Sequence, residues 1–191
     1  LTITNKETII HAFAFANCET LTKITLPTES GMEIKEHAFN YAKGLTKVNN
    51  LEYVKLVGDY AFANTGLREV TIGSDATYGE GAFFKSYLET VTIGKNTTFG
   101  LGAFQDCLNL VTVNMPTEGN VHFGRGCFAY DDKLKTIDLS KVDSVIEPET
   151  FYGCKSLYSV NLANVKEIGD YAFSDCSGIV TIDIPVVETI G

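Results

Sequence analysis

Apolar positions recur along this chain with a period of 21 to 24 residues. The residue before each repeated Phe is small, usually Ala, and the residue five positions before it is apolar in every copy. Similarity at a fixed period indicates a repeat architecture, in which each unit buries its apolar face against its neighbours. Eight of the twelve Phe residues occupy this slot: Phe15, Phe39, Phe62, Phe83, Phe104, Phe128, Phe151 and Phe173.

After each Phe comes a second pattern, Leu-x-x-Ile-x-Leu, seen most clearly at Leu21, Ile24 and Leu26. Its last three positions alternate between apolar and polar residues, which is typical of a strand. We expect one short strand per repeat, eight in all. Successive strands run in the same direction and are joined by about twenty residues, so they must pair in parallel. The copy after Phe39 has Asn50 where the last apolar residue belongs, which predicts a local bulge.

The segment Ile168–Pro185, with Ala172, Phe173, Cys176, Ile179, Ile182 and Ile184 in the repeated positions, resembles a unit of the BspA-like, Treponema-type leucine-rich repeats. Similar units cover essentially the whole chain. The resemblance implies an α/β repeat fold: a right-handed solenoid with a parallel β-sheet on its concave face and short helical turns or minor strands on its convex face. It also implies a surface protein of mucosal bacteria or protists that is used in adhesion. Members share an architecture rather than a ligand, so the resemblance names no partner.

Residues 1–191 are therefore expected to form a single leucine-rich repeat solenoid of about eight repeats. Leu1–Ile3 fits the end of a strand whose own Phe is missing, and Val187–Gly191 stops just before an expected Ala-Phe pair. We expect both ends to be truncated in the middle of a repeat of a longer array.

The charge balance limits the class of partner. Lys and Arg number 15 against 24 Asp and Glu, which gives a net charge of −9. This balance disfavours nucleic acid and anionic lipid surfaces as general partners. The apolar runs are only a few residues long, far short of the ~20 that cross a bilayer, so we expect no membrane span in this segment.

Four of the five cysteines lie three residues after a repeated Phe: Cys18, Cys107, Cys154 and Cys176. Other copies have Ala42, Thr65, Ser86 and Asp131 in this slot, which indicates a small core position rather than a reactive one. No Cys-x-x-Cys pair is present, so no metal site is expected. Cys154 and Cys176 lie in adjacent repeats within disulfide range, but their parallel side chains and the odd cysteine count favour free thiols.

The remaining candidate motifs also favour structural roles. Three Gly-x-Gly strings, at 79–81, 100–102 and 124–126, lack the further residues of a nucleotide-binding loop and fit a repeated tight turn. His11, His37 and His122 lie at different offsets in distant repeats, so they cannot share a site. Asp143, Glu147 and Glu149 could form an acidic cluster, but a solvated loop is the preferred interpretation. We expect no cofactor and no enzymatic activity.

The polar residues between the apolar positions of each strand would face solvent, on a surface roughly 38 Å long if eight strands are spaced by about 4.8 Å. An alternative stays open on equal terms: these Thr and Asn residues serve β propensity and solubility, and binding takes place elsewhere. Tyr158 and Val180, one position further back on neighbouring strands, are the candidate apolar anchors. The predicted partner-binding residues are Thr71, Thr92, Asn114, Asp138, Tyr158, Asn161, Val180 and Asp183.

The sequence thus predicts a non-enzymatic cell-surface recognition or adhesion module that binds a protein, or a glycan, through its concave face. Two alternatives stay open. The repeats could form an intracellular scaffold that holds a partner protein, since free cysteines are compatible with a reducing compartment. They could also be a spacer for a catalytic or anchoring domain outside this chain.

Overall fold

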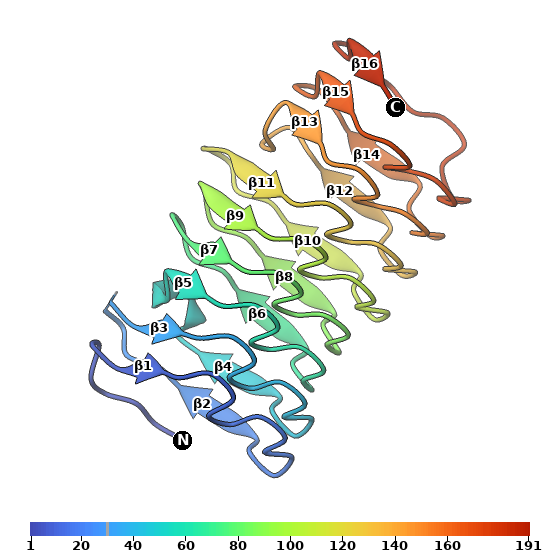
Figure 1. The fold of residues 1–191 in the computed structure, drawn as a ribbon. Coiled ribbons are helices and arrows are strands. Elements are labelled where there is room, and N and C mark those ends of the chain that lie inside the picture. Colours follow the sequence, from blue (N-terminus) through green and yellow to red (C-terminus); the bar gives the residue numbers. More distant parts are fainter. Residues whose placement is uncertain (30) are drawn as a thin grey trace.

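The computed structural model describes residues 1–29 and 31–191, which wind into a solenoid with two rows of parallel strands (Figure 1). The first row carries the Ile-x-Leu pattern, and we call its outer surface the Ile-x-Leu face. Its seven strands are β2 (Lys23–Thr25), β4 (Lys47–Asn49), β6 (Glu69–Thr71), β8 (Thr90–Thr92), β10 (Thr112–Asn114), β12 (Thr136–Asp138) and β14 (Ser159–Asn161).

The second row is built around the apolar residue five positions before each Phe. We call its outer surface the second face. Its strands are β1 (Ile9–Ile10), β3 (Glu33–Ile34), β5 (Leu56–Val57), β7 (Thr77–Tyr78), β9 (Thr97–Phe99), β11 (Val121–Phe123), β13 (Val145–Ile146), β15 (Glu167–Ile168) and β16 (Thr189–Ile190). The prediction of one strand per repeat was therefore incomplete, because the pattern gives this slot a single apolar residue and too little alternation to indicate a strand.

All strand pairs are parallel and join equivalent positions of adjacent repeats, as Val91 does with Val70 and Val113. Backbone pairing along the Ile-x-Leu face is divided into three sheets, β2-β4, β6-β8-β10 and β12-β14. The first division lies where Asn50 replaces an apolar residue. There Asn50 adopts a left-handed conformation (φ 66°) and is followed by the 3-10 helix η1 (Leu51–Tyr53).

The repeated Phe residues form one continuous stack through the interior. All seven neighbouring pairs are stacked, with ring centroids 5.2–5.6 Å apart and interplanar angles of 1–8°. The six inner rings are fully buried, and Phe15 and Phe173 at the two ends are partly buried. The stack confirms the repeat registration and explains why one ring size is used at this slot.

The predicted eighth strand of the Ile-x-Leu face is wrong. Residues 181–184 form no strand, and the side chains of Ile182 and Ile184 are both 38% exposed. Backbone pairing on this face ends at β14, whereas the second face continues to β16. The segment 181–184 diverges from Ile168–Cys176 and leaves a hollow of about 760 Å³.

Between the two rows each repeat passes through a third surface, which we call the turn side: the residues from three before to three after each repeated Phe. In every repeat the residues two before and two after the Phe have positive φ, between 53° and 73°. The alternation points backbone amides along the solenoid axis. Gly102, Phe104 and Asp106 each donate to a carbonyl of the following repeat, with N···O distances of 2.9 Å.

The glycines of the Gly-x-Gly strings have two different roles in this geometry. A Cβ on Gly79, Gly100 or Gly124 would lie within 2.9 Å of backbone atoms of the preceding repeat, so these positions require glycine for close approach. Gly81, Gly102 and Gly126 lie in the left-handed slot, which Tyr60, Glu149 and Tyr171 fill in other repeats.

The cysteine slot lies in the core, and the five cysteines are free. Cys107, Cys154 and Cys176 each donate their thiol hydrogen to the Phe carbonyl of the preceding repeat, at 3.0–3.2 Å. Ser86 makes the same bond to Phe62, at 2.8 Å. Asp131 is the exception in this slot: it is fully buried, and neither carboxyl oxygen has a hydrogen-bond partner.

Candidate binding face

The structure places five of the predicted site residues in one exposed row, the last position of consecutive strands on the Ile-x-Leu face. Four of these strands, β6, β8, β10 and β12, bury the middle residue, β14 buries it partly, and all five expose the residue after it. The row consists of Thr71 on β6, Thr92 on β8, Asn114 on β10, Asp138 on β12 and Asn161 on β14.

Side-chain hydrogen bonds join neighbouring members of this row. Asn114 donates from Nδ2 to the Thr92 hydroxyl at 3.2 Å, and Asn161 donates to Asp138 Oδ1 at 2.9 Å. Asn49 and Thr25 form the same kind of pair on β4 and β2, at 3.2 Å. Two of the four neighbouring pairs of the row are thus bonded, one in the β6-β8-β10 sheet and one in the β12-β14 sheet, which orders these side chains before a partner binds.

The other three predicted residues lie differently. Tyr158 directly precedes β14 and is 56% exposed, at the edge of the face. Val180 is 91% exposed, and Asp183 lies in the segment that forms no strand. The structure therefore does not place Val180 and Asp183 on the sheet, and the expected pairing of Tyr158 and Val180 as neighbouring strand anchors is wrong.

A groove of about 410 Å³ crosses the face at its first division, between β4 and β6. Asn50 and Glu52, at the start of η1 just after β4, line the groove where the pairing between β4 and β6 is missing. Thr71 and Thr92 from the predicted row lie along one wall. Five further polar lining residues occupy strand positions that the alternation predicts to face solvent: Thr25, Lys47, Asn49, Glu69 and Thr90. The sequence did not place Asn50 and Glu52 in a groove, although the irregular Asn50 marks the position.

The groove carries three charged side chains: Lys47 on one strand, and Glu52 and Glu69 across the division. Among residues 1–29 and 31–191, none of the three has a salt-bridge partner within 4.0 Å. By contrast, the neighbouring Arg68 and Glu89 pair with each other. The groove thus offers two free carboxylates and one free ammonium group, which suits a partner with a basic side chain.

The residues considered for other chemistry are dispersed. His37 stacks between Phe13 and Tyr60, with centroid distances of 4.7 and 5.3 Å. His122 Nδ1 lies 3.2 Å from Asp143. Glu149 pairs with Arg125 rather than joining a cluster with Asp143. In the part of the chain that the structure describes, no three His, Cys, Asp or Glu side chains converge as a metal site would require.

No helix among the described residues has the length and apolar character needed to cross a bilayer.

Comparisons with known proteins identify the repeat. A family model described as the BspA type leucine rich repeat region matches six copies, over residues 8–135 and 78–191. No functionally curated protein matches the chain.

Three solved structures share the fold. A leucine-rich repeat protein from Bacteroides ovatus is 23% identical, with a TM-score of 0.58 over 93% of this chain and 59% of that one. The Treponema pallidum leucine-rich repeat protein is 19% identical, with a TM-score of 0.61 over 90% and 71%. One from Eubacterium ventriosum is 17% identical, with a TM-score of 0.51 over 96% and 78%. The chain thus spans less than two thirds of the Bacteroides ovatus protein.

Proposed function

Since the chain belongs to the BspA-type leucine-rich repeat family, we propose that it is a non-enzymatic recognition module that binds a protein partner through the Ile-x-Leu face. Leucine-rich repeat proteins are generally protein-interaction modules, and extended solenoid surfaces suit large partners. We also propose that the solenoid is right-handed, with the Ile-x-Leu face on its concave side.

The observation that carries this proposal is the groove between β4 and β6 beside the row of exposed, hydrogen-bonded polar residues. The groove holds unpaired charge at the division between two sheets, and the row continues for three more strands beyond it. We propose that Thr71, Thr92, Asn114, Asp138 and Asn161 contact the partner, and that Tyr158 contributes an aromatic contact at the edge.

The family resemblance further supports a cell-surface location and a role in adhesion to host or neighbouring cells. The net charge of −9 and the free Glu52 and Glu69 carboxylates favour a partner segment rich in Lys or Arg. The cysteines do not separate the surface role from an intracellular scaffold, because their side chains serve the core.

A binding assay with matched variants tests this proposal. The labelled chain is incubated with cultured epithelial cells, and bound label is measured by flow cytometry. Thr71→Lys with Thr92→Lys adds two long cationic side chains to the groove wall, and we expect at least a tenfold loss of binding.

The control variant is Thr77→Lys with Thr98→Lys, which changes two exposed threonines on β7 and β9 of the second face. It should bind as the unchanged chain does. Protease treatment of the cells should abolish binding. Equal binding by both variants, or no binding by the unchanged chain, would contradict the proposal.

A further inference from the structure

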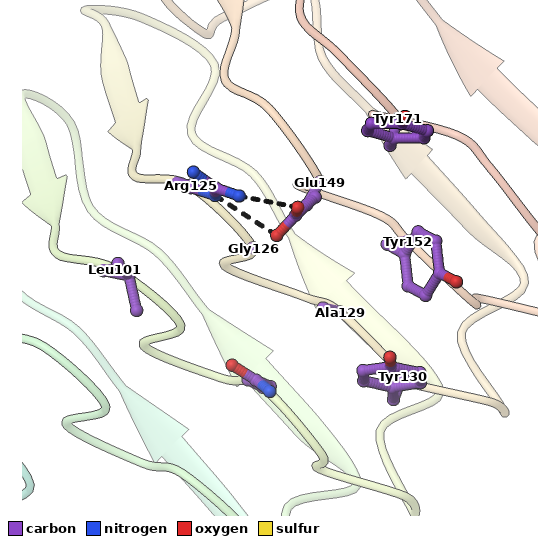
Figure 2. Close-up of a pocket in the computed structure, with 9 residues that line it drawn as sticks. Leu101, Arg125, Gly126, Ala129, Tyr130, Glu149, Tyr152 and Tyr171 are labelled. Carbon is purple, nitrogen blue, oxygen red and sulfur yellow. Dashed lines mark hydrogen bonds and ion pairs between the residues drawn. The ribbon is translucent and has the colours of Figure 1, made fainter.

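A pocket of about 510 Å³ opens on the turn side, away from both strand rows (Figure 2). Its floor is formed by the buried residues Gly126 and Ala129. Leu101 and Gln105 of the preceding repeat form one wall. The other side is lined by Arg125, Tyr130, Glu149, Tyr152 and Tyr171.

The pocket results from small residues at two slots that hold large side chains elsewhere. Gly126 occupies the slot two before the Phe, where other repeats have Phe13, Tyr60 and Tyr171. A Cβ at Gly126 would contact only Ala129, at 3.9 Å. Left-handed φ values occur at this slot in every repeat, so the backbone conformation is a property of the fold. Gly81 and Gly102 also lack a side chain here, but Phe84 and Gln105 follow the repeated Phe in their repeats, where the pocket repeat has Ala129.

Arg125 and Glu149 form a bidentate pair at the rim. Arg125 donates from Nε to Oε2 at 3.2 Å and from Nη2 to Oε1 at 2.7 Å. The hydrogen bonds and opposite charges raise the pKa of Arg125 and lower the pKa of Glu149, so both groups stay ionised at neutral pH. The pair leaves guanidinium N–H donors and carboxylate lone pairs free for a ligand. Its net charge is zero, which favours a neutral ligand over an anion or a cation.

The aromatic side of the pocket supplies exposed ring surface beside these polar groups. Tyr130 and Tyr152 meet edge to face, with centroids 5.3 Å apart and an interplanar angle of 79°. Tyr130 is 42% and Tyr171 is 65% exposed. Such rings offer an apolar surface with a polar hydroxyl at its edge. A matching ligand presents C–H groups on one face and several hydroxyls around its edge, as a pyranose ring does.

We propose that this turn-side pocket binds a neutral saccharide, with a pyranose ring against the tyrosines and its hydroxyls bonded to Arg125, Glu149 and Gln105. The volume lies within the roughly 300–1,000 Å³ of typical small-molecule sites, which accommodates a mono- or disaccharide. This site is separate from the Ile-x-Leu face, so it is independent of the proposed protein-binding function.

The test is isothermal titration calorimetry of the full chain with neutral sugars: glucose, galactose, mannose, N-acetylglucosamine, lactose and cellobiose. Sialic acid and glucosamine serve as charged comparisons. We expect at least one neutral sugar to bind measurably and to bind tighter than either charged sugar. Preference for a charged sugar, or no binding by any neutral one, would overturn the proposal.

Two variants locate the binding. Gly126→Tyr fills the pocket from its floor, and the same backbone slot holds Tyr60 and Tyr171, so we expect the variant to fold and to bind at least tenfold more weakly. Arg125→Ala with Glu149→Ala removes an exposed pair and should weaken binding similarly without affecting the core. The matched control, Lys95→Ala with Glu118→Ala, removes another exposed ion pair (2.7 Å) and should leave binding unchanged. Unchanged binding by both pocket variants would refute the site.

Discussion

Asp131 is buried without a hydrogen bond at a slot where Cys and Ser side chains of other repeats make one, and its replacement should stabilise the protein. Burial raises the pKa of the Asp131 carboxyl well above its ordinary value, an effect that the nearby backbone N–H of Cys107 opposes, and neither oxygen accepts a hydrogen bond of normal geometry. Leaving a buried polar group unsatisfied costs about 1–3 kcal/mol. In Asp131→Ser the hydroxyl would donate to the Phe104 carbonyl, as Ser86 does to Phe62 one repeat interval away. We therefore expect the free energy of unfolding to rise by about 1–3 kcal/mol at pH 7.

The assay is urea unfolding followed by far-UV circular dichroism, and a gain of this size shifts the midpoint by about 0.5–1.5 M if the slope is about 2 kcal/mol/M. The pH dependence supplies a second readout. Because the native carboxyl holds its proton more tightly than the unfolded one, it destabilises the fold increasingly as pH rises above the unfolded pKa of about 3.9. The advantage of Asp131→Ser over the unchanged chain should therefore shrink as pH falls from 7 to 4.

The difference in unfolding free energy between Asp131→Ser and the unchanged chain reports on Asp131. Carboxylates whose pKa is lowered by ion pairs, such as Glu118 and Glu149, titrate in both proteins and cancel from the difference. A less stable variant at pH 7, or an advantage that does not change with pH, would refute the reasoning.

Three further predictions concern packing and thiol reactivity. Phe104→Ala should cost about 3–5 kcal/mol in urea unfolding, because the ring is fully buried between Phe83 and Phe128; an unchanged midpoint would contradict the stack. Gly73→Ala should lower the free energy of unfolding by about 3 kcal/mol or more, since its Cβ would lie 1.8 Å from the Glu52 carbonyl oxygen. Gly126→Ala should lower it by only about 1–2 kcal/mol, because the cost there is the left-handed backbone alone. Equal losses of stability in urea unfolding would argue against this explanation. In a thiol titration of the native protein with Ellman's reagent at pH 8, the partly exposed Cys18 should react first. Burial raises the pKa of Cys107, Cys127 and Cys154, and raises the pKa of Cys176 to about 11. Rapid reaction of all five native thiols would be inconsistent with the burial of these four cysteines.

The periodic features were predictable because one residue type repeats at one position. The Phe spacing alone indicated the repeat and its registration, and the alternation after it located seven strands of the Ile-x-Leu face to within a residue. The eighth strand was predicted wrongly because Ile182 and Ile184 repeat the alternation of the inner strands, and the alternation does not show whether the backbone pairs with β14. Thr71 and Thr92 were predicted at an exposed face, and the structure adds the groove beside them.

The departures from the period were harder to interpret. Asn50 indicated an irregularity, yet nothing in the sequence showed that a groove would lie beside it. Asp131 was grouped with small core residues, and the cost of burying its carboxyl appears only when its neighbours are placed. The turn-side pocket forms because Gly126 and Ala129 have no large side chains to fill it. A pattern of large apolar residues gives no signal at a position where the side chain is small.

The backbone hydrogen bonds between repeats on the turn side all run one way, which has a consequence for how such arrays change length. Each repeat presents amide donors toward the following repeat and carbonyl acceptors toward the preceding one. A duplicated copy inserted between any two repeats finds an acceptor surface ahead and a donor surface behind, and a deleted copy leaves two surfaces that still match. Whole repeats can therefore be gained or lost by recombination of the gene without the need for a new interface, while an insertion of part of a repeat would break the Phe stack.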